Sequence, residues 1–254
     1  MNLPSGPCVV SVVLPCLDEE EAIAPLVREI LAEGVDEVVV VDNGSTDRTA
    51  AVARSAGARV VAEPRRGYGR ACAGGVAAVR GDAEVVCFLD GDGSDVPAFL
   101  PAIADAVASG RADFAMGSRL RGMREAGSMT PQQLVAGRLA GLLLKAVFGV
   151  AATDMSPFRA MRVSQLRRLG MGETTYGWNL EMQMRVAAAG LRTVELPVDH
   201  RRRRGGVSKV SGDPIAGLQA AWKIATTFLR LWWSLHRAAP RAAAPALPSV
   251  DHSR

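Results

Sequence analysis

The segment 84-EVVCFLDGD-92 is the most informative part of the sequence, because it is an apolar run that ends in two carboxylates with one residue between them. Residues 84–89 have the composition of a buried β-strand, and Asp90 and Asp92 follow it with Gly91 between them. In an extended segment, residues two apart point to the same side, and two such carboxylates repel each other unless a cation or a proton relieves them. Mg²⁺ and Mn²⁺ prefer carboxylate oxygens and share such sites with phosphates. The pair therefore predicts a metal site at a strand end, against the alternative of a solvated acidic turn.

The chain before this segment alternates strands with helices. We expect strands at residues 9–14, 37–41 and 59–62, and helices at residues 19–31, 46–56 and 68–79. This order predicts an α/β fold with a mostly parallel sheet and helices on both faces, in which ligands bind beyond the carboxyl ends of the strands. Asp18 and Glu19 follow the first strand and Asp42 the second, so we expect these acids at the same edge of the sheet as Asp90.

The regular alternation of predicted strands and helices ends in the second half of the chain. We expect strands at 114–116, at the end of 153–162 and at 192–198, and helices at 132–148, 179–189 and 214–235. The resulting organisation is a disordered N-terminus (1–7), a catalytic domain (8–212), a C-terminal amphipathic helix (213–236) and a disordered tail (237–254). Within the domain, residues 8–118 form the ligand-binding half and residues 119–212 a smaller mixed half.

The composition indicates the class of protein but does not identify its ligand. The chain has 254 residues, of which 48% are hydrophobic and 22% charged, enough for a sizeable globular core. The net charge of +4 favours an anionic partner. Four cysteines without a Cys-x-x-Cys pair favour a reduced, cytoplasmic setting. The N-terminus lacks the charge pattern of a signal peptide, and no apolar run reaches membrane-spanning length.

Three other readings of the acidic motif are weaker. A calcium-binding EF-hand loop starting at Asp90 would need Gly and Glu where Asp95 and Pro101 stand. A haloacid-dehalogenase-like phosphatase would use Asp90 as nucleophile and Asp92 as acid/base, but its motif normally follows the first strand rather than the fourth. A dinucleotide-binding fold would need glycines after the first strand, and the turn 15-PCLDE-19 has none.

Six motifs together resemble glycosyltransferase family 2, whose catalytic domain has the GT-A fold. Three lie in the first half of the chain, 15-PCLDEE-20, 41-VDNGSTD-47 and 90-DGD-92. Three more, 153-TDMSPF-158, 177-GWNLE-181 and 203-RRGGVSK-209, resemble motifs of the dolichyl- and polyprenyl-phosphate sugar transferases. The resemblance covers about residues 8–212. It implies an inverting, metal-dependent enzyme that moves a hexose from a UDP- or GDP-sugar to a polyprenyl phosphate, with Mg²⁺ or Mn²⁺ as cofactor.

The resemblance also implies roles for residues at the strand ends. The donor's base and ribose would be bordered by Pro15, Leu17, Glu19 and Asp42. Asp90 and Gly91 would face the ribose and diphosphate, and Asp90 and Asp92 would hold the metal. The subgroup often has Gln where Ser94 stands here, so the third metal contact is left open among Ser94, Asp95 and water. Gly91 is expected to loosen the loop.

The acceptor decides which further residues take part. A phosphate acceptor is already an anion, so it needs cationic positioning rather than a general base, and the candidates for that are Arg119, Arg203, Ser208 and Lys209. A soluble hydroxyl acceptor would instead need Asp154 or Glu181 as base. A third hypothesis is a nucleotide-sugar-binding module without turnover.

Two basic or apolar segments bear on partners. The run 201–204 predicts a loop that closes over phosphates; nucleic acid is disfavoured because no aromatic residues interleave with the arginines. The helix expected at 214–235 is interrupted by Gln219, Lys223 and Arg230, which disfavours a bilayer span. It would either pack on the domain or lie in the membrane interface, making the protein peripheral on the inner face of the membrane.

Overall fold

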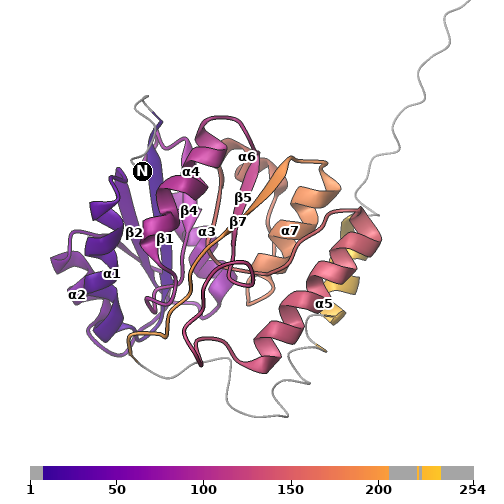
Figure 1. Cartoon of the computed structure of the whole chain (residues 1–254). Helices are drawn as coiled ribbons and strands as arrows, with labels where there is room; N and C mark the ends of the chain where they lie inside the picture. The colour runs from indigo at the N-terminus through magenta and orange to yellow at the C-terminus, as the bar shows by residue number, and fades with distance from the viewer. Residues whose placement is uncertain (1–7, 206–221, 223–224, 236–254) are drawn as a thin grey trace, which may run out of the picture.

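One seven-stranded sheet forms the centre of the computed structural model, which describes residues 8–205, 222 and 225–235 (Figure 1). The strands are β1 (Val10–Cys16), β2 (Glu37–Asp42), β3 (Arg59–Ala62), β4 (Val85–Phe88), β5 (Phe114–Ser118), β6 (Arg159–Arg162) and β7 (Thr193–Pro197). Their order is β3-β2-β1-β4-β6-β5-β7, and β6 alone among them runs antiparallel to its neighbours. The predicted α/β fold with a mostly parallel sheet is confirmed.

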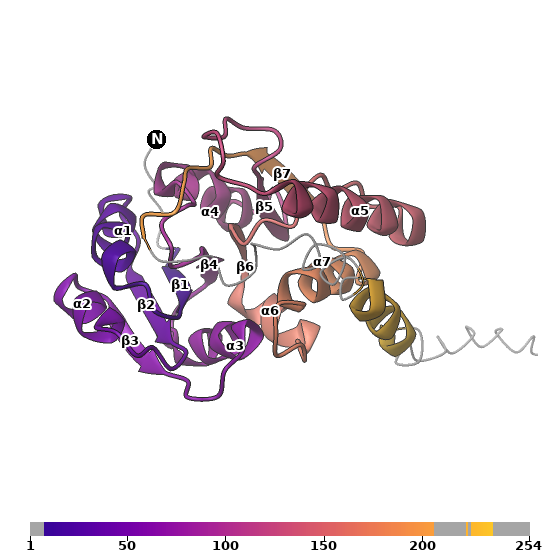
Figure 2. The same cartoon turned by 90° about the horizontal axis from the view of Figure 1, so that it is seen from below.

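Helices cover both faces of this sheet. They are α1 (Glu20–Ala32), α2 (Thr49–Ser55), α3 (Tyr68–Ala78), α4 (Leu100–Ala108), α5 (Pro131–Phe148), α6 (Val163–Leu169) and α7 (Trp178–Ala188). Residues 225–235, here called the C-terminal helix, are also helical. The side chains of α1, α2 and α4 pack on one face, and those of α3, α6 and α7 on the other (Figure 2).

The alternation of side chains along the strands creates the two cores. In β1, Val12 and Leu14 face the α1 side, whereas Val13 faces α3. In β4, Val85 and Cys87 face the first side, and Val86 and Phe88 the second. Because these strands are buried on both faces, their sequences are almost continuously apolar.

Several boundaries differ from those expected. Strand β1 continues through Pro15 to Cys16, where the sequence predicted an end before the proline. The missing N–H of Pro15 costs nothing there, because the ladder to β4 already ends at Val13 and Phe88. Two helices, α4 and α6, were not anticipated. The stripe of Leu100, Ile103, Ala104 and Val107 on α4 is fully buried and has the spacing of a core-facing helix.

The two predicted halves share one sheet. Strand β6 inserts between β4 and β5, and β7 extends the sheet beside β5 in parallel. A separate apolar cluster joins α5, α7 and the C-terminal helix, where the rings of Phe148 and Phe228 meet edge to face at 6.5 Å. The predicted split at residue 118 therefore does not separate two independent sheets.

Some predicted segments lie outside the described residues, namely 1–7, 206–221, 223–224 and 236–254. These include both termini predicted as disordered and the first part of the helix predicted at 214–235. Among the helices in the described part of the chain, none has the length and hydropathy needed to cross a bilayer.

Candidate active site

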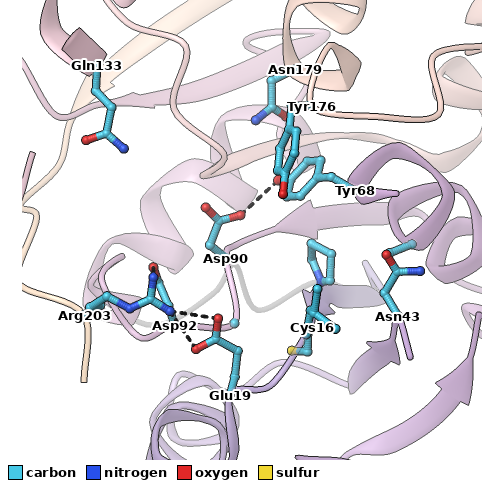
Figure 3. Close-up of a pocket in the computed structure, with 14 residues that line it drawn as sticks. Cys16, Glu19, Asn43, Tyr68, Asp90, Asp92, Gln133, Tyr176, Asn179 and Arg203 are labelled. Atoms are coloured by element: carbon cyan, nitrogen blue, oxygen red, sulfur yellow. Dashed lines mark hydrogen bonds and ion pairs between the residues drawn. The ribbon is translucent and has the colours of Figure 1, made fainter. Parts of the chain in front are cut away.

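A cavity of about 230 Å³ opens at the carboxyl ends of β1, β2 and β4 (Figure 3). It is lined by Pro15, Cys16, Leu17, Glu19, Asn43, Tyr68, Ala71, Asp90, Gly91, Asp92, Gln133, Tyr176, Asn179 and Arg203. Seven of the residues singled out from the sequence are in this set, namely Pro15, Leu17, Glu19, Asp90, Gly91, Asp92 and Arg203. The predicted convergence of strand-end acids therefore occurs for Glu19, Asp90 and Asp92.

The acidic pair is held by specific hydrogen bonds. The Tyr68 hydroxyl donates to Asp90 Oδ1 at 3.0 Å, and the Asp90 N–H donates to Asp95 Oδ2 at 3.3 Å. The N–H of Ser94 donates to Asp92 Oδ1 at 2.9 Å. Burial, followed by the charge of Asp90, raises the pKa of Tyr68 well above its usual range, so its phenol is a hydrogen-bond donor at neutral pH.

The site gathers three carboxyl groups, those of Asp90, Asp92 and Asp95, at one partly buried loop. Burial raises the pKa of Asp90, and the nearby carboxylates of Asp92 and Asp95 raise it further. A divalent cation would relieve this repulsion, so the donor set fits Mg²⁺ or Mn²⁺. Within the described residues, no group of three or more His, Cys, Asp or Glu side chains is arranged to hold a metal. The candidate protein ligands are therefore the two carboxylates of Asp90 and Asp92.

Both residues considered for the third metal contact are buried in the fold. Ser94 and Asp95 are both buried, and the Asp95 carboxylate supports the backbone of Asp90. Its other oxygen lies 3.8 Å from Nδ1 of the buried His200. Asp95 thus stabilises the acidic loop through its hydrogen bond to the Asp90 backbone.

Gly91 is needed for close packing, and the expectation that it loosens the loop is wrong. A Cβ on this residue would lie 2.3 Å from Sγ of Cys16 and 3.3 Å from the carbonyl oxygen of Pro15. The acidic loop therefore lies directly against the end of β1, where no side chain larger than hydrogen fits between Asp90 and Asp92.

The arginine run lies across the acidic loop. Arg203 Nη2 contacts Glu19 Oε1 at 2.9 Å and Oε2 at 3.0 Å, and its Nη1 lies 4.0 Å from Asp92 Oδ2. The Arg204 N–H donates to the carbonyl of Asp92 at 3.0 Å. The side chains of Arg201 and Arg204 both pair with Glu29 on α1. This arrangement brings one cation, Arg203, to the cavity, whereas Ser208 and Lys209 lie outside the described residues.

Arg119 and Asp154 form a buried bidentate ion pair away from the cavity lining. Arg119 Nε contacts Asp154 Oδ2, and Nη2 contacts Oδ1, each at 2.8 Å. Burial alone would raise the pKa of Asp154, but the hydrogen bonds and charge of Arg119 outweigh it and hold that pKa below its usual range. A carboxylate so paired is a poor proton acceptor, and its arginine is already engaged.

Glu181 is likewise committed to the fold. Its side chain is 1% exposed and accepts the N–H groups of Gly172 and Glu173, the latter at 2.7 Å. It also pairs with Arg185 one turn later at 2.8 Å. The geometry therefore favours a structural role for Asp154 and Glu181 over the general-base role considered from the sequence.

Asp42 and its neighbour Asn43 differ in their position relative to the cavity. The Asp42 carboxylate accepts the N–H of Ser45 at 2.9 Å and is not among the cavity-lining residues, so its contact with the base or ribose stays a prediction. Asn43 lines the cavity, and its amide donates to the carbonyls of Glu63 and Arg65 in the loop between β3 and α3.

The sequence reasoning missed seven of the lining residues, namely Cys16, Asn43, Tyr68, Ala71, Gln133, Tyr176 and Asn179. Cys16, Asn43 and Asn179 lie inside motifs quoted above, so their positions carried a signal. Gln133 lies near the start of α5 and Tyr176 in the loop before α7, both distant in sequence from the acidic motif, and no motif marked either residue.

Comparisons with known proteins identify the family. The family model described as glycosyl transferase family 2 matches residues 11–170. The chain belongs to glycosyltransferase family 2. An uncharacterized glycosyltransferase of Mycobacterium tuberculosis is 39% identical to this transferase over 219 residues, which cover 85% of this chain and 97% of the relative. A dolichyl-phosphate hexose transferase of Haloferax volcanii is 34% identical over 84% of this chain and 90% of its own length.

A solved structure supports the fold of this family 2 transferase. The glucosyl-3-phosphoglycerate synthase of Mycobacterium tuberculosis, crystallised with Mn²⁺, UDP and its product, superposes with a TM-score of 0.69 at 24% identity. The match covers 89% of this chain and 80% of the synthase. The predictions of family 2 membership and a GT-A fold are confirmed.

Proposed function

We propose that this transferase moves a hexose from a UDP- or GDP-sugar to a polyprenyl phosphate, with inversion at the anomeric carbon and with Mg²⁺ or Mn²⁺ as cofactor. The names of two relatives support the acceptor class, the dolichyl-phosphate hexose transferase and a polyprenol monophosphomannose synthase of Mycolicibacterium smegmatis that is 29% identical. The synthase solved with UDP and Mn²⁺ supports the donor and cofactor classes.

The main support for a phosphate acceptor is the chemistry of one wall of the cavity. Gln133, Tyr176 and Asn179 lie on the far side of Asp90 from Glu19 (Figure 3). In the part of the chain that the structure describes, this wall presents amides and a phenol but no carboxylate. A hydroxyl acceptor would need a base there, whereas a phosphate acceptor is already an anion.

The residues of the cavity support an in-line displacement. Asp90 and Asp92 would hold the cation, which would neutralise charge on the departing diphosphate as a Lewis acid. Pro15, Leu17 and Glu19 border the place proposed for the nucleoside. An oxygen of the acceptor phosphate forms the new bond to the anomeric carbon. The bond to the donor's diphosphate breaks, and its electron pair leaves with the nucleoside diphosphate.

Arg203 supplies the positive charge that such a reaction needs. It lies on the cavity wall between Glu19 and Asp92 without a bidentate lock on the metal-binding carboxylate. A guanidinium can exchange a carboxylate for a phosphate of similar geometry. We therefore assign Arg203 to the diphosphate or acceptor phosphate, and keep Ser208 and Lys209 as predicted partners in this task.

The proposal includes peripheral contact with an anionic lipid surface, where a polyprenyl acceptor resides. Helix α5 and the C-terminal helix lie together at the end of the molecule opposite α1 and α2 (Figures 1 and 2). They expose Val135, Leu142, Val147, Leu229 and Trp233. Arg138 and Lys145 are exposed on α5 as well, and residues 126–153 and 214–235 contain no Asp or Glu. Apolar side chains among unopposed cations suit an anionic membrane interface.

The experiment that tests the proposal supplies UDP- and GDP-hexoses with Mn²⁺ and compares two lipid acceptors of equal chain length. We expect transfer to polyprenyl phosphate and none to the corresponding polyprenol. Transfer to the alcohol or to a soluble sugar hydroxyl would overturn the phosphate-acceptor proposal and return Asp154 and Glu181 to consideration as bases. Donor binding without turnover on any acceptor would instead favour a nucleotide-sugar-binding module.

A further inference from the structure

Tyr68 lines the cavity and contacts the Asp90 carboxylate. Its hydroxyl donates to Asp90 Oδ1 at 3.0 Å, drawn as a dashed line in Figure 3. Tyr68 is the first residue of α3, on the opposite face of the sheet from α1 and Glu19. It was not among the residues that the sequence motifs indicated.

The start of α3 is interlocked with the loop before α7. A Cβ on Gly67 would lie 2.3 Å from the carbonyl oxygen of Thr174, and one on Gly69 would lie 2.2 Å from that of Glu173. The Arg70 N–H donates to the same Thr174 carbonyl at 3.2 Å. Two backbones in direct contact on both sides of Tyr68 leave its Cα little freedom.

The loop that contacts the start of α3, residues 172–175, is held by two further side chains. Glu181 accepts the N–H groups of Gly172 and Glu173, and Arg230 of the C-terminal helix pairs with the Glu173 carboxylate. Glu173 is buried, so this ion pair connects the C-terminal helix to the loop with little solvent around the carboxylate.

The ring of Tyr68 is fixed as well as its backbone. It stacks on Tyr176 with 6.2 Å between centroids and 24° between planes. The side chain of Asn179, at the start of α7, approaches the same hydroxyl. Beneath α7, the buried Arg159 donates to the Asn179 carbonyl at 3.0 Å. The donor of the Tyr68–Asp90 bond is therefore held from several directions.

We propose that Tyr68 is a positioning residue that fixes the rotamer of Asp90, so that one carboxylate oxygen is kept by the protein and the other is available to the donor complex. This assignment rests on the proposed role of Asp90 toward metal and diphosphate. Without the hydroxyl, the Asp90 side chain would sample rotamers that turn it away from the cavity, and the cost would appear in binding of the nucleoside diphosphate with its cation.

The test is a double-substitution cycle on Tyr68 and Asp90. Phenylalanine at position 68 keeps the ring and its stack on Tyr176 and deletes one oxygen. The Kd of UDP or GDP, whichever the wild type binds, is measured by calorimetry with saturating Mn²⁺ for wild type, Y68F, D90A and Y68F/D90A. We expect Y68F to weaken binding about tenfold or more in the wild-type background, the range for a hydrogen bond to a charged group. In the D90A background the same change should alter Kd less than about twofold.

A positioning role and a merely structural role give different results in this cycle. A structural role would weaken binding by the same factor in both backgrounds, and an unchanged Kd in Y68F would mean that the hydroxyl does nothing; either result overturns the proposal. Ser55→Ala is the matched control, because it deletes a hydroxyl on α2 that donates to its own helix at Ala51. If wild type bound neither nucleotide with Mn²⁺, the proposed function itself would fail, which is a separate outcome.

Discussion

At the scale of single residues, Gly91 packs the acidic loop against the end of the first strand. The contact with Cys16 leaves no room for a methyl group, and overpacking of this kind costs about 1–3 kcal/mol. We expect G91A to displace the neighbouring carboxylates and to lower kcat/KM. Removing the sulfur as well, in G91A/C16A, should restore most of the activity. The measurement is kcat/KM and Tm for both single variants and the double variant; equal losses in G91A and G91A/C16A would contradict the assigned contact.

Asp92 offers a second prediction at this scale. Asparagine can still accept the N–H of Ser94 through its side-chain oxygen, so D92N should fold with a Tm close to that of wild type. Even partners of metal ligands typically cost 10- to 100-fold when mutated, so a change in a ligand should lower kcat/KM by more than about a hundredfold. Sugar transfer and thermal unfolding would be measured in parallel. Activity within a few-fold of wild type would remove Asp92 from the metal site.

Three of the residues that the sequence reasoning placed in the cavity share one property. Glu19, Asp90 and Asp92 lie two to four residues after the ends of β1 and β4, and parallel strands bring such residues to one edge of the sheet. Gln133 and Tyr176 reach the same cavity through tertiary packing of α5 and the loop before α7, which no local pattern encodes. Asp154 lies in a quoted motif, yet burial and Arg119 place it in the fold rather than at the cavity.

At the scale of elements, α5 and the C-terminal helix carry the prediction on membrane contact. We expect L142S/L229S to weaken binding to vesicles of anionic phospholipid by more than about a hundredfold, since each apolar side chain that becomes buried contributes roughly 1.5–3 kcal/mol. Flotation with anionic and zwitterionic vesicles measures this. Met123→Ser is the matched control, because Met123 is 75% exposed but lies outside both helices. Unchanged flotation of the double variant would contradict membrane contact through these helices, and a change of oligomeric state in gel filtration would instead indicate an oligomer interface.

Strands β5 and β7 are joined at their start by an ion pair that makes stability depend on pH. Hydrogen bonds from Arg192 lower the pKa of Asp113 to about 2. A carboxyl with a depressed pKa stabilises the fold above its unfolded pKa of about 4 and loses that contribution as pH falls toward 2. Because Arg192 is largely exposed, we expect D113N to cost only about 1 kcal/mol at pH 7. Denaturant unfolding at pH 7 and pH 2.5 tests this, since the difference between D113N and wild type should shrink at the lower pH.

Elements were predictable where their patterns are strong. The alternating strands and helices of residues 10–78 appear as expected, with shifts of a few residues at their ends. The position of β6 was not predictable, because its antiparallel insertion between β4 and β5 depends on pairing across the whole sheet. The short helix α6 directly follows β6 and buries only Val163 and Leu166, so its pattern is brief.

At the scale of the whole molecule, the cavity should make stability depend on ligand. Any ligand that binds the native state alone raises the unfolding free energy by mass action, by about 2.7 kcal/mol at a hundred times its Kd. We expect UDP or GDP with Mn²⁺ to raise Tm, and the same nucleotide with EDTA to raise it less, because Asp90 and Asp92 repel the diphosphate when no cation is present. A thermal-shift series measures both. Equal shifts with Mn²⁺ and with EDTA would contradict a metal-assisted donor site.

The return of residues 201–205 over the acidic loop has a consequence for how the protein is made. Arg203 and its partner Glu19 are 184 residues apart in the chain, and the Arg204 N–H closes on Asp92. On the ribosome, β1 to β4 emerge early, but the cavity lacks this wall until almost the last segment of the domain has left the exit tunnel. A nascent chain stalled before residue 201 would hold the acids without their arginine and would lack this wall of the cavity.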